Sequence, residues 1–199
     1  VNKSEKAFTI PQKDLITEGI AYDSATKRFF VSSIHRRKIV SIDAKGKVSD
    51  FSLEADGLWS VSGMRVDEKR KILWVTTTAF PQMQNFQKAD DGKSGVFKYD
   101  LRSGKLLKKY LLSNADGKHA LGDLIVAKNG DVFASDSTSP NIYRITTGKD
   151  ELEIFLTSEN FASLQGLAFS PDEKTLFAAD YSKGIFKISM PDKKISQIT

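Results

Sequence analysis

Five oxygen-bearing side chains stand beside short apolar segments, where a fold could bring them together. They are Glu18, Asp123, Asp136, Gln165 and Asp180. Carboxylate and amide oxygens are hard donors, and several of them converging on one point would suit Ca²⁺ or Mg²⁺. An ion held there could polarise a carbonyl group or lower the pKa of a bound water. Whether these side chains converge depends on the elements that carry them.

Those elements recur along the chain as a four-fold repeat. In each copy an apolar strand is followed by a polar turn and then by a second strand that ends in polar residues. Equivalent positions, spaced by 44, 60 and 43 residues, fall at Gly19, Gly63, Asp123 and Gly166. The longer middle spacing reflects about 16 extra residues. Their polar composition between residues 78 and 95 indicates a loop insertion.

Two further short strands, rich in Val, Ile, Phe and Tyr, follow each of these pairs. Four antiparallel strands in a repeat of about 43 residues are typical of a propeller blade. We therefore predict an all-β fold, a β-propeller. Its four visible four-stranded blades cover about residues 18–55, 61–112, 121–157 and 164–199.

A separate strand is predicted at residues 7–10, before the first blade. We interpret it as the outer strand of a closing blade, because such a blade joins the chain ends and removes exposed edges. This favours part of a six-bladed propeller, with roughly 75 residues absent. A closed four-bladed ring is the alternative. A truncated propeller would expose blade edges, through which we expect self-association.

Propeller geometry places the start of the first strand and the end of the second strand of every blade on one face. Glu18 and Gln165 should then share a rim with Asp136, Asp180 and the loop residue His119. Loops that converge on rigid strands commonly form ligand sites, so we predict a small-molecule site there. We expect His119, Asp136 and Asp180 to contact the substrate. The alternative for the two aspartates is that they cap backbone N–H groups, and for His119 that it is an ordinary loop histidine.

Three segments resemble the senescence marker protein / gluconolactonase / luciferin-regenerating enzyme family. They are Glu18-Gly19, Gly122-Asp123 and Gln165-Gly166-Leu167-Ala168-Phe169-Ser170-Pro171-Asp172. Members of that family are six-bladed propellers with a divalent metal in the channel, and they hydrolyse lactones or related esters. The resemblance implies that Glu18 and Gln165 bind the metal, with Ca²⁺ favoured over Mg²⁺ and Zn²⁺. It also implies that Asp123 is the catalytic residue that orients substrate or water.

Three departures from the family pattern keep a second function open. Gly122 stands in place of an asparagine, Ala120 in place of an arginine, and the third metal ligand would belong to a fifth blade. The first hypothesis is a divalent-metal-dependent hydrolase of a lactone or sugar-acid ester. The second is a non-catalytic propeller that binds a small molecule or peptide on the same rim. A weaker resemblance of residues 96–106 to the yellow and royal jelly propellers favours the second.

Composition excludes several other classes of protein. The 199 residues include no cysteine, which rules out a disulfide scaffold, a thiolate zinc site and a cysteine nucleophile. The net charge is +5, but the lysines are scattered and no aromatic-basic motif accompanies them, so we expect no nucleic-acid partner. No apolar run approaches the roughly 18 residues of a membrane span. The absence of cysteine and the initial valine are compatible with an exported bacterial protein without establishing one.

Overall fold

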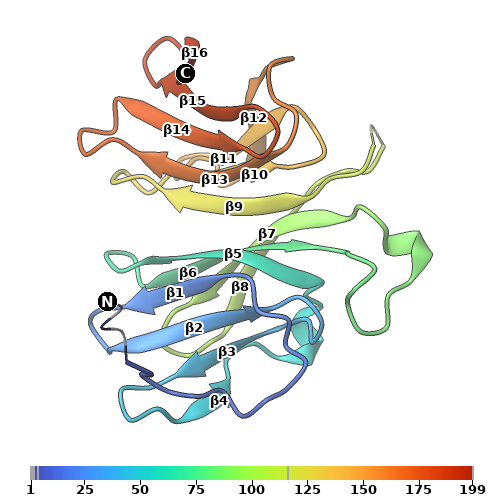
Figure 1. Ribbon diagram of the computed structural model, residues 1–199, viewed down its shortest axis with the longest axis vertical. Helices are drawn as coiled ribbons and strands as arrows, with labels where there is room; N and C mark the ends of the chain where they lie inside the picture. Colours follow the sequence, from blue (N-terminus) through green and yellow to red (C-terminus); the bar gives the residue numbers. More distant parts are fainter. Residues whose placement is uncertain (1–2, 4, 116, 199) are drawn as a thin grey trace.

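The protein is built from four separate antiparallel sheets of four strands each. The computed structural model describes residues 3, 5–115 and 117–198. Within each sheet the strands pair in chain order, so every sheet is a meander whose first strand lies innermost (Figure 1). This confirms the predicted all-β propeller architecture with four four-stranded blades.

The sheets follow one another along the chain. The first contains β1 (Ile20–Asp23), β2 (Arg28–Ser33), β3 (Lys38–Ile42) and β4 (Val48–Asp50). The second contains β5 (Ser60–Asp67), β6 (Ile72–Thr78), β7 (Ser94–Asp100) and β8 (Leu106–Leu111). The third contains β9 (Leu121–Val126), β10 (Val132–Asp136), β11 (Asn141–Ile145) and β12 (Leu152–Thr157). The fourth contains β13 (Leu164–Phe169), β14 (Thr175–Asp180), β15 (Gly184–Ser189) and β16 (Ile195–Ile198).

Two short 3₁₀ helices, η1 (Glu54–Asp56) and η2 (Lys88–Asp90), lie in the connections. In the part of the chain that the structure describes, no helix has the length and apolar character needed to cross a membrane.

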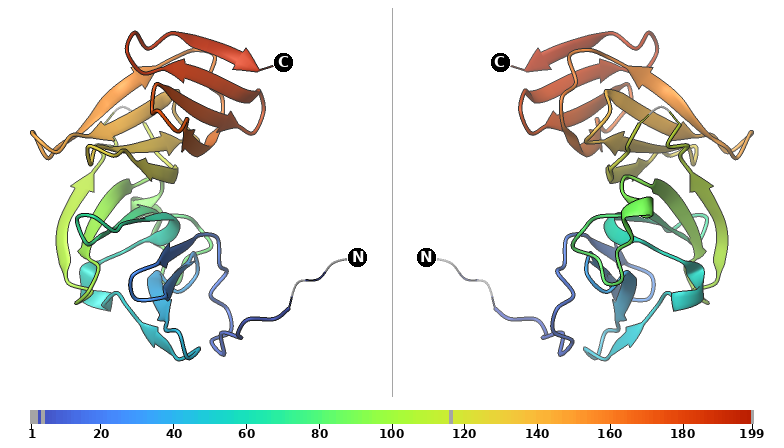
Figure 2. Two further views of the ribbon diagram at one scale, coloured as in Figure 1. Left: turned by 90° about the vertical axis from the view of Figure 1, so that its left-hand side faces the viewer. Right: turned by 90° about the vertical axis from the view of Figure 1, so that its right-hand side faces the viewer.

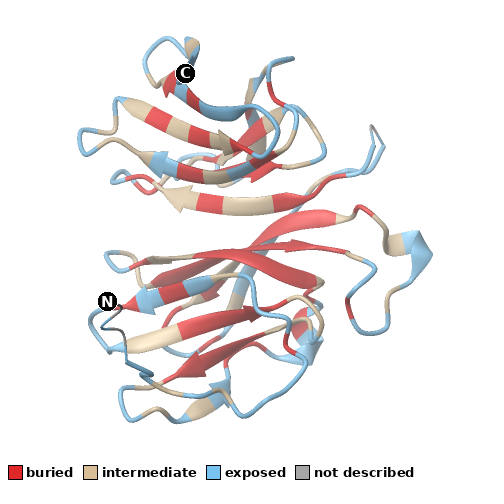
Figure 3. Cartoon of the chain, in the orientation of Figure 1, coloured by how far each residue is buried: buried red, intermediate tan, exposed pale blue. Residues whose placement is uncertain are grey.

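Neighbouring sheets pack face to face through separate apolar clusters. Each cluster joins residues of two sheets, such as Phe30 with Leu73, Trp74 with Leu124, and Phe133 with Phe186. Successive side chains of a strand point to opposite faces. A strand covered on both faces is therefore buried throughout, as all seven residues of β6 are. In β14 buried and half-buried residues alternate (Figure 3), because the fourth sheet is covered on one face.

The four sheets form an open arc. Their innermost strands β1, β5, β9 and β13 pack in that order, each against the next. The first and fourth sheets lie at opposite ends of the arc (Figures 1 and 2). The sheets therefore do not close into a four-bladed ring, and completion to six blades stays a prediction.

The segment that precedes β1 covers the outer face of the first sheet. Phe8 and Ile10 pack there against the buried side chains of Val31 and Val40. Residues 7–10 form no strand in this arrangement, because they contact that sheet through side chains rather than through a hydrogen-bonded edge. No sheet of a closing blade is present among the described residues, so the assignment of 7–10 to such a blade stays a prediction.

The predicted insertion connects β6 to β7 and projects from the edge of the arc where the innermost strands begin (Figure 1). It is tied to the first blade by contacts with His35 and Arg36. The Gln84 N–H donates to the His35 carbonyl at 2.8 Å, and the Gln82 carbonyl oxygen lies 2.7 Å from His35 Nδ1. The insertion therefore leans over the turn between β2 and β3.

Candidate functional site

The beginnings of the innermost strands approach one another at backbone distance. A Cβ atom on Gly19 would lie 2.2 Å from the Ser62 carbonyl oxygen, and one on Gly63 would lie 2.8 Å from the Gly122 carbonyl oxygen. Only glycine allows the chain to come this close. The repeated glycines are therefore required where adjacent blades meet at the channel.

Two buried hydroxyls, which we call the hydroxyl clamp, join these strand starts across neighbouring blades. Thr76 Oγ1 in β6 accepts the Gly63 N–H at 2.8 Å and lies 3.2 Å from the Gly122 carbonyl oxygen of the next blade. Ser135 in β10 has the same role one blade further on, where its hydroxyl donates to the Gln165 carbonyl. The clamp holds the backbone at points where the register of the innermost strands shifts.

The clamped strand starts surround an open cavity of about 320 Å³. Its polar side chains come from all four blades and are Glu18, Arg65, Asp123 and Gln165. Glu18, Asp123 and Gln165, which the sequence places on one rim, thus line a single cavity. Their chemical roles stay predictions.

The carboxylates of the cavity have different surroundings. Asp123 Oδ2 is 3.1 Å from Arg65 Nη2 and also accepts the Leu167 N–H at 3.3 Å. Glu18 has no ion-pair partner among the described residues. Its side chain reaches solvent at the cavity mouth, but the protein around it displaces enough water to raise the pKa of the carboxyl, and the charge of Asp123 raises it further. A cation at this point would meet an uncompensated carboxylate.

The Gln165 side chain lies beside Gly122 of the neighbouring blade. A Cβ atom on Gly122 would lie 3.7 Å from Gln165 Oε1. The Gln165 amide nitrogen faces Ser163 Oγ at 3.4 Å. A Cβ atom at position 122 would therefore be in ordinary van der Waals contact with the Gln165 amide.

The donor set of the cavity fits a hard divalent cation. Glu18 and Asp123 offer carboxylate oxygens and Gln165 offers an amide oxygen, which are ligands that Ca²⁺ accepts. No three His, Cys, Asp or Glu side chains of the described chain are grouped to hold a metal ion by themselves. The amide oxygen of Gln165 would therefore be needed as a third protein ligand.

Arg65 was missed by sequence reasoning, although a signal exists. In the repeat its position corresponds to Ala21, Ile125 and Ala168, which are apolar or small. An arginine at a position that the other copies keep apolar indicates a local function. Here it supplies the positive charge beside Asp123.

His119 and Asp136 form a buried pair outside this cavity. His119 Nδ1 is 2.8 Å from Asp136 Oδ2, and the Ala120 N–H donates to Asp136 Oδ1 at 3.0 Å. Burial opposes ionisation of Asp136, but the hydrogen bonds from Ala120, Thr138, Ser139 and His119 outweigh it and hold the pKa of this carboxyl below its usual value. The pair anchors the loop after β10, and substrate contact by these residues stays a prediction.

Asp180 also lies outside the cavity and caps backbone. Its carboxylate accepts the Ala162 and Ser163 N–H groups at 2.8 Å each, and those of Ser182 and Lys183 at 2.9 and 3.0 Å. This is the capping arrangement considered as the alternative from the sequence. Substrate contact by Asp180 stays a prediction.

No protein-family model matches the sequence, and no curated protein matches it. Solved structures do match in fold. A gluconolactonase from Xanthomonas campestris shares 19% identity with a TM-score of 0.61, over 91% of this chain and 60% of that one. A putative gluconolactonase shares 14% identity with a TM-score of 0.68, over 92% and 63%.

A further match is a catalytically inactive virginiamycin B lyase from Staphylococcus aureus, solved with quinupristin. It shares 16% identity with a TM-score of 0.71, over 95% of this chain and 58% of that one. The chain thus spans between 58% and 63% of the length of these three structures. At such identities the likeness establishes the fold, and the resemblance to gluconolactonase-type β-propellers is confirmed at that level.

Proposed function

We propose that this chain is a divalent-metal-dependent hydrolase that acts on a lactone or a sugar-acid ester. The observation that carries the proposal is the convergence of Glu18, Asp123 and Gln165 from three blades on one cavity. The fold likeness to gluconolactonases supports the same class of substrate.

The residues of the cavity suit separate tasks. Glu18, Asp123 and Gln165 would hold the ion, Ca²⁺ being favoured by the all-oxygen donor set. The ion would supply Lewis-acid polarisation of the ester carbonyl and a lowered pKa of bound water. Asp123, fixed by Arg65 and by the Leu167 N–H, orients substrate or water. Arg65 adds a guanidinium that can bind a carboxylate or an oxyanion on the substrate.

The test is hydrolysis of D-glucono-1,5-lactone by the 199-residue chain, after chelation and after return of Ca²⁺, Mg²⁺ or Zn²⁺. We expect metal-dependent turnover above the spontaneous rate. Glu18→Ala should lose at least about 100-fold of this turnover, because a bound ion lowers the activation barrier by several kcal/mol. Glu151→Ala, at an exposed position away from the cavity, should keep full turnover. Equal turnover in Glu18→Ala, or none above background with any of the three ions, would reject the proposal.

One observation favours the non-catalytic alternative. Arg65 already neutralises Asp123, one of the two carboxylates of the cavity. A binding propeller would use this ion pair and the Gln165 amide to hold a ligand without metal. Such binding would survive chelation, whereas ligand binding that chelation abolishes would exclude this function.

A further inference from the structure

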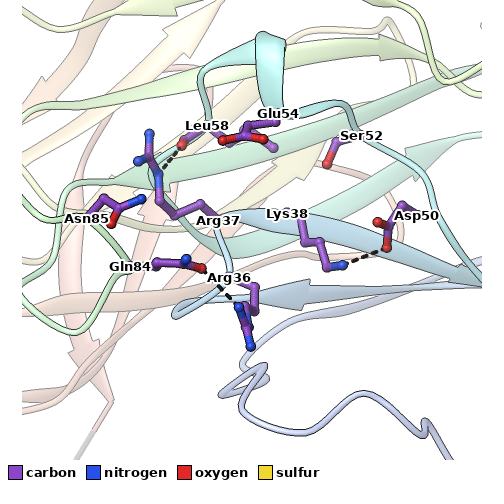
Figure 4. Close-up of a pocket in the computed structure, with 9 residues that line it drawn as sticks. All are labelled: Arg36, Arg37, Lys38, Asp50, Ser52, Glu54, Leu58, Gln84 and Asn85. Carbon is purple, nitrogen blue, oxygen red and sulfur yellow. Dashed lines mark hydrogen bonds and ion pairs between the residues drawn. The ribbon is translucent and has the colours of Figure 1, made fainter.

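A second cavity, of about 410 Å³, lies between the first blade and the insertion (Figure 4). It shares no lining residue with the channel cavity. Three consecutive cations at the turn into β3 line it, together with residues at and after the end of β4 and two amides of the insertion. The polar lining residues are Arg36, Arg37, Lys38, Asp50, Ser52, Glu54, Gln84 and Asn85.

The three cations differ in their partners. Arg36 makes a two-pronged ion pair with Asp14, at 3.1 Å from Nε to Oδ1 and 2.6 Å from Nη2 to Oδ2. Lys38 Nζ pairs with Asp50 at 2.8 Å. Arg37 forms no ion pair within the described part of the chain. Its charge is therefore available to an outside anion.

The Arg37 side chain is held in a defined position. Its Nε donates to the Leu58 carbonyl oxygen at 2.9 Å (Figure 4), and the residue is half-buried. Both Nη groups remain as donors. A planar guanidinium fixed in this way matches the two oxygens of a carboxylate or phosphate, and ion-assisted hydrogen bonds of this kind are about twice as strong as neutral ones.

The remaining groups limit the ligand to one negative charge. The polar lining has three cations and two carboxylates, and the carboxylates of Asp50 and Glu54 would repel a second negative charge. They can instead accept hydrogen bonds from hydroxyl groups. Gln84 accepts from Arg36 Nη1 at 3.1 Å through Oε1, which leaves its NH₂ group as a donor.

We propose that this cavity binds a small carboxylate that carries several hydroxyl groups. Arg37 holds the carboxylate, and Asp50 and Glu54 accept its hydroxyls. The volume lies in the range of small-ligand sites, roughly 300–1,000 Å³. Because the cavity is open to solvent, we expect a dissociation constant of about 1 mM that rises with salt.

The probe is D-gluconate, titrated by calorimetry into the chain in low salt with a chelator present. Sorbitol, which has the hydroxyls without the carboxylate, should not bind, and acetate should bind at least about tenfold more weakly. Arg37→Gln should raise the dissociation constant of gluconate at least about tenfold. Arg102→Gln, a change at an exposed arginine on another turn, should leave it unchanged.

Two further measurements separate this site from the channel and from a folding defect. Asn85→Asp keeps Arg37 and its bond to Leu58 but adds a negative charge to the cavity, so it should also weaken the binding of gluconate. Amide shifts in NMR spectra on adding gluconate should move around Arg37 and Asn85, and Arg65→Gln should not alter the affinity. The proposal fails if both cavity variants bind gluconate with the parent affinity, or if the amide shifts centre on Asp123. It also fails if glucose 6-phosphate binds more tightly than gluconate, or if no binding of gluconate is seen up to about 20 mM.

Discussion

Replacement of Thr76 by valine should weaken the whole propeller, because it removes one of the two hydroxyls of the clamp without changing the shape of the side chain. Thr76 is fully buried, and its Oγ1 accepts the Gly63 N–H at 2.8 Å and lies 3.2 Å from the Gly122 carbonyl oxygen. Valine leaves both backbone groups without that partner. A buried polar group that loses its partner costs about 1–3 kcal/mol. Since Gly122 is only half-buried, we expect a loss of roughly 2–4 kcal/mol in the free energy of unfolding.

The assay is urea unfolding followed by the fluorescence of Trp74, which is buried in the same strand. Thr76→Ser keeps the hydroxyl and should cost only about 1 kcal/mol for the lost methyl group. The neighbouring Thr77 provides a matched control, because its hydroxyl is buried without a hydrogen-bond partner in the described structure. Thr77→Val should therefore be neutral or stabilising. If Thr76→Val and Thr77→Val changed the unfolding midpoint equally, the clamp would have no energetic role.

Three other predictions concern titration and assembly. Ionisation of Glu18 is disfavoured in the folded state, so Glu18→Gln should unfold at a higher urea concentration than the parent at pH 7. The difference should vanish at about pH 3.5, which is below the pKa of glutamate in the unfolded chain. A lower urea midpoint for the variant at pH 7 would contradict this. Because the pKa of Asp136 is lowered in the folded state, its ionised carboxylate stabilises the fold at pH values above the pKa of aspartate in the unfolded chain. Asp136→Asn should therefore lower the free energy of unfolding by about 2–4 kcal/mol at pH 7, and the difference from the parent should shrink as the pH falls below about 4. A constant difference across that pH range would argue against this role. Tyr181 and Ile185 of the fourth blade are 88% and 45% exposed, so sedimentation velocity should show self-association that Ile185→Lys reduces, whereas a monomer at all concentrations would exclude it.

The fold could be predicted from the sequence because each blade repeats the same physical demands. Glycine recurs at positions 19 and 63, where neighbouring strands come within backbone contact. Polar turns and short β-branched or aromatic strands recur with it. The same repetition also placed Glu18 and Gln165 at one cavity, since equivalent positions of successive blades face the same axis.

The partners of the polar side chains could not be predicted in this way. Arg65 belongs to β5 and meets Asp123 of β9, 58 residues later in the chain. The Thr76 hydroxyl likewise bridges from its own blade to the next. Such pairs depend on side-chain direction across a blade interface, which strand periodicity does not specify.

Acceptor capacity separates the carboxylates that could bind a ligand from those that maintain the fold. An ionised carboxylate has about four lone-pair sites. Asp180 uses its sites on four backbone N–H groups, and Asp136 is similarly occupied by its own loop and by His119. Asp123 accepts through Oδ2, and Glu18 has no donor among the described residues. An aspartate at the end of a strand has the same sequence environment whether it caps a turn or binds a ligand. Its unused acceptor sites distinguish the two, and among these four carboxylates the two that retain such sites, Asp123 and Glu18, line the channel cavity.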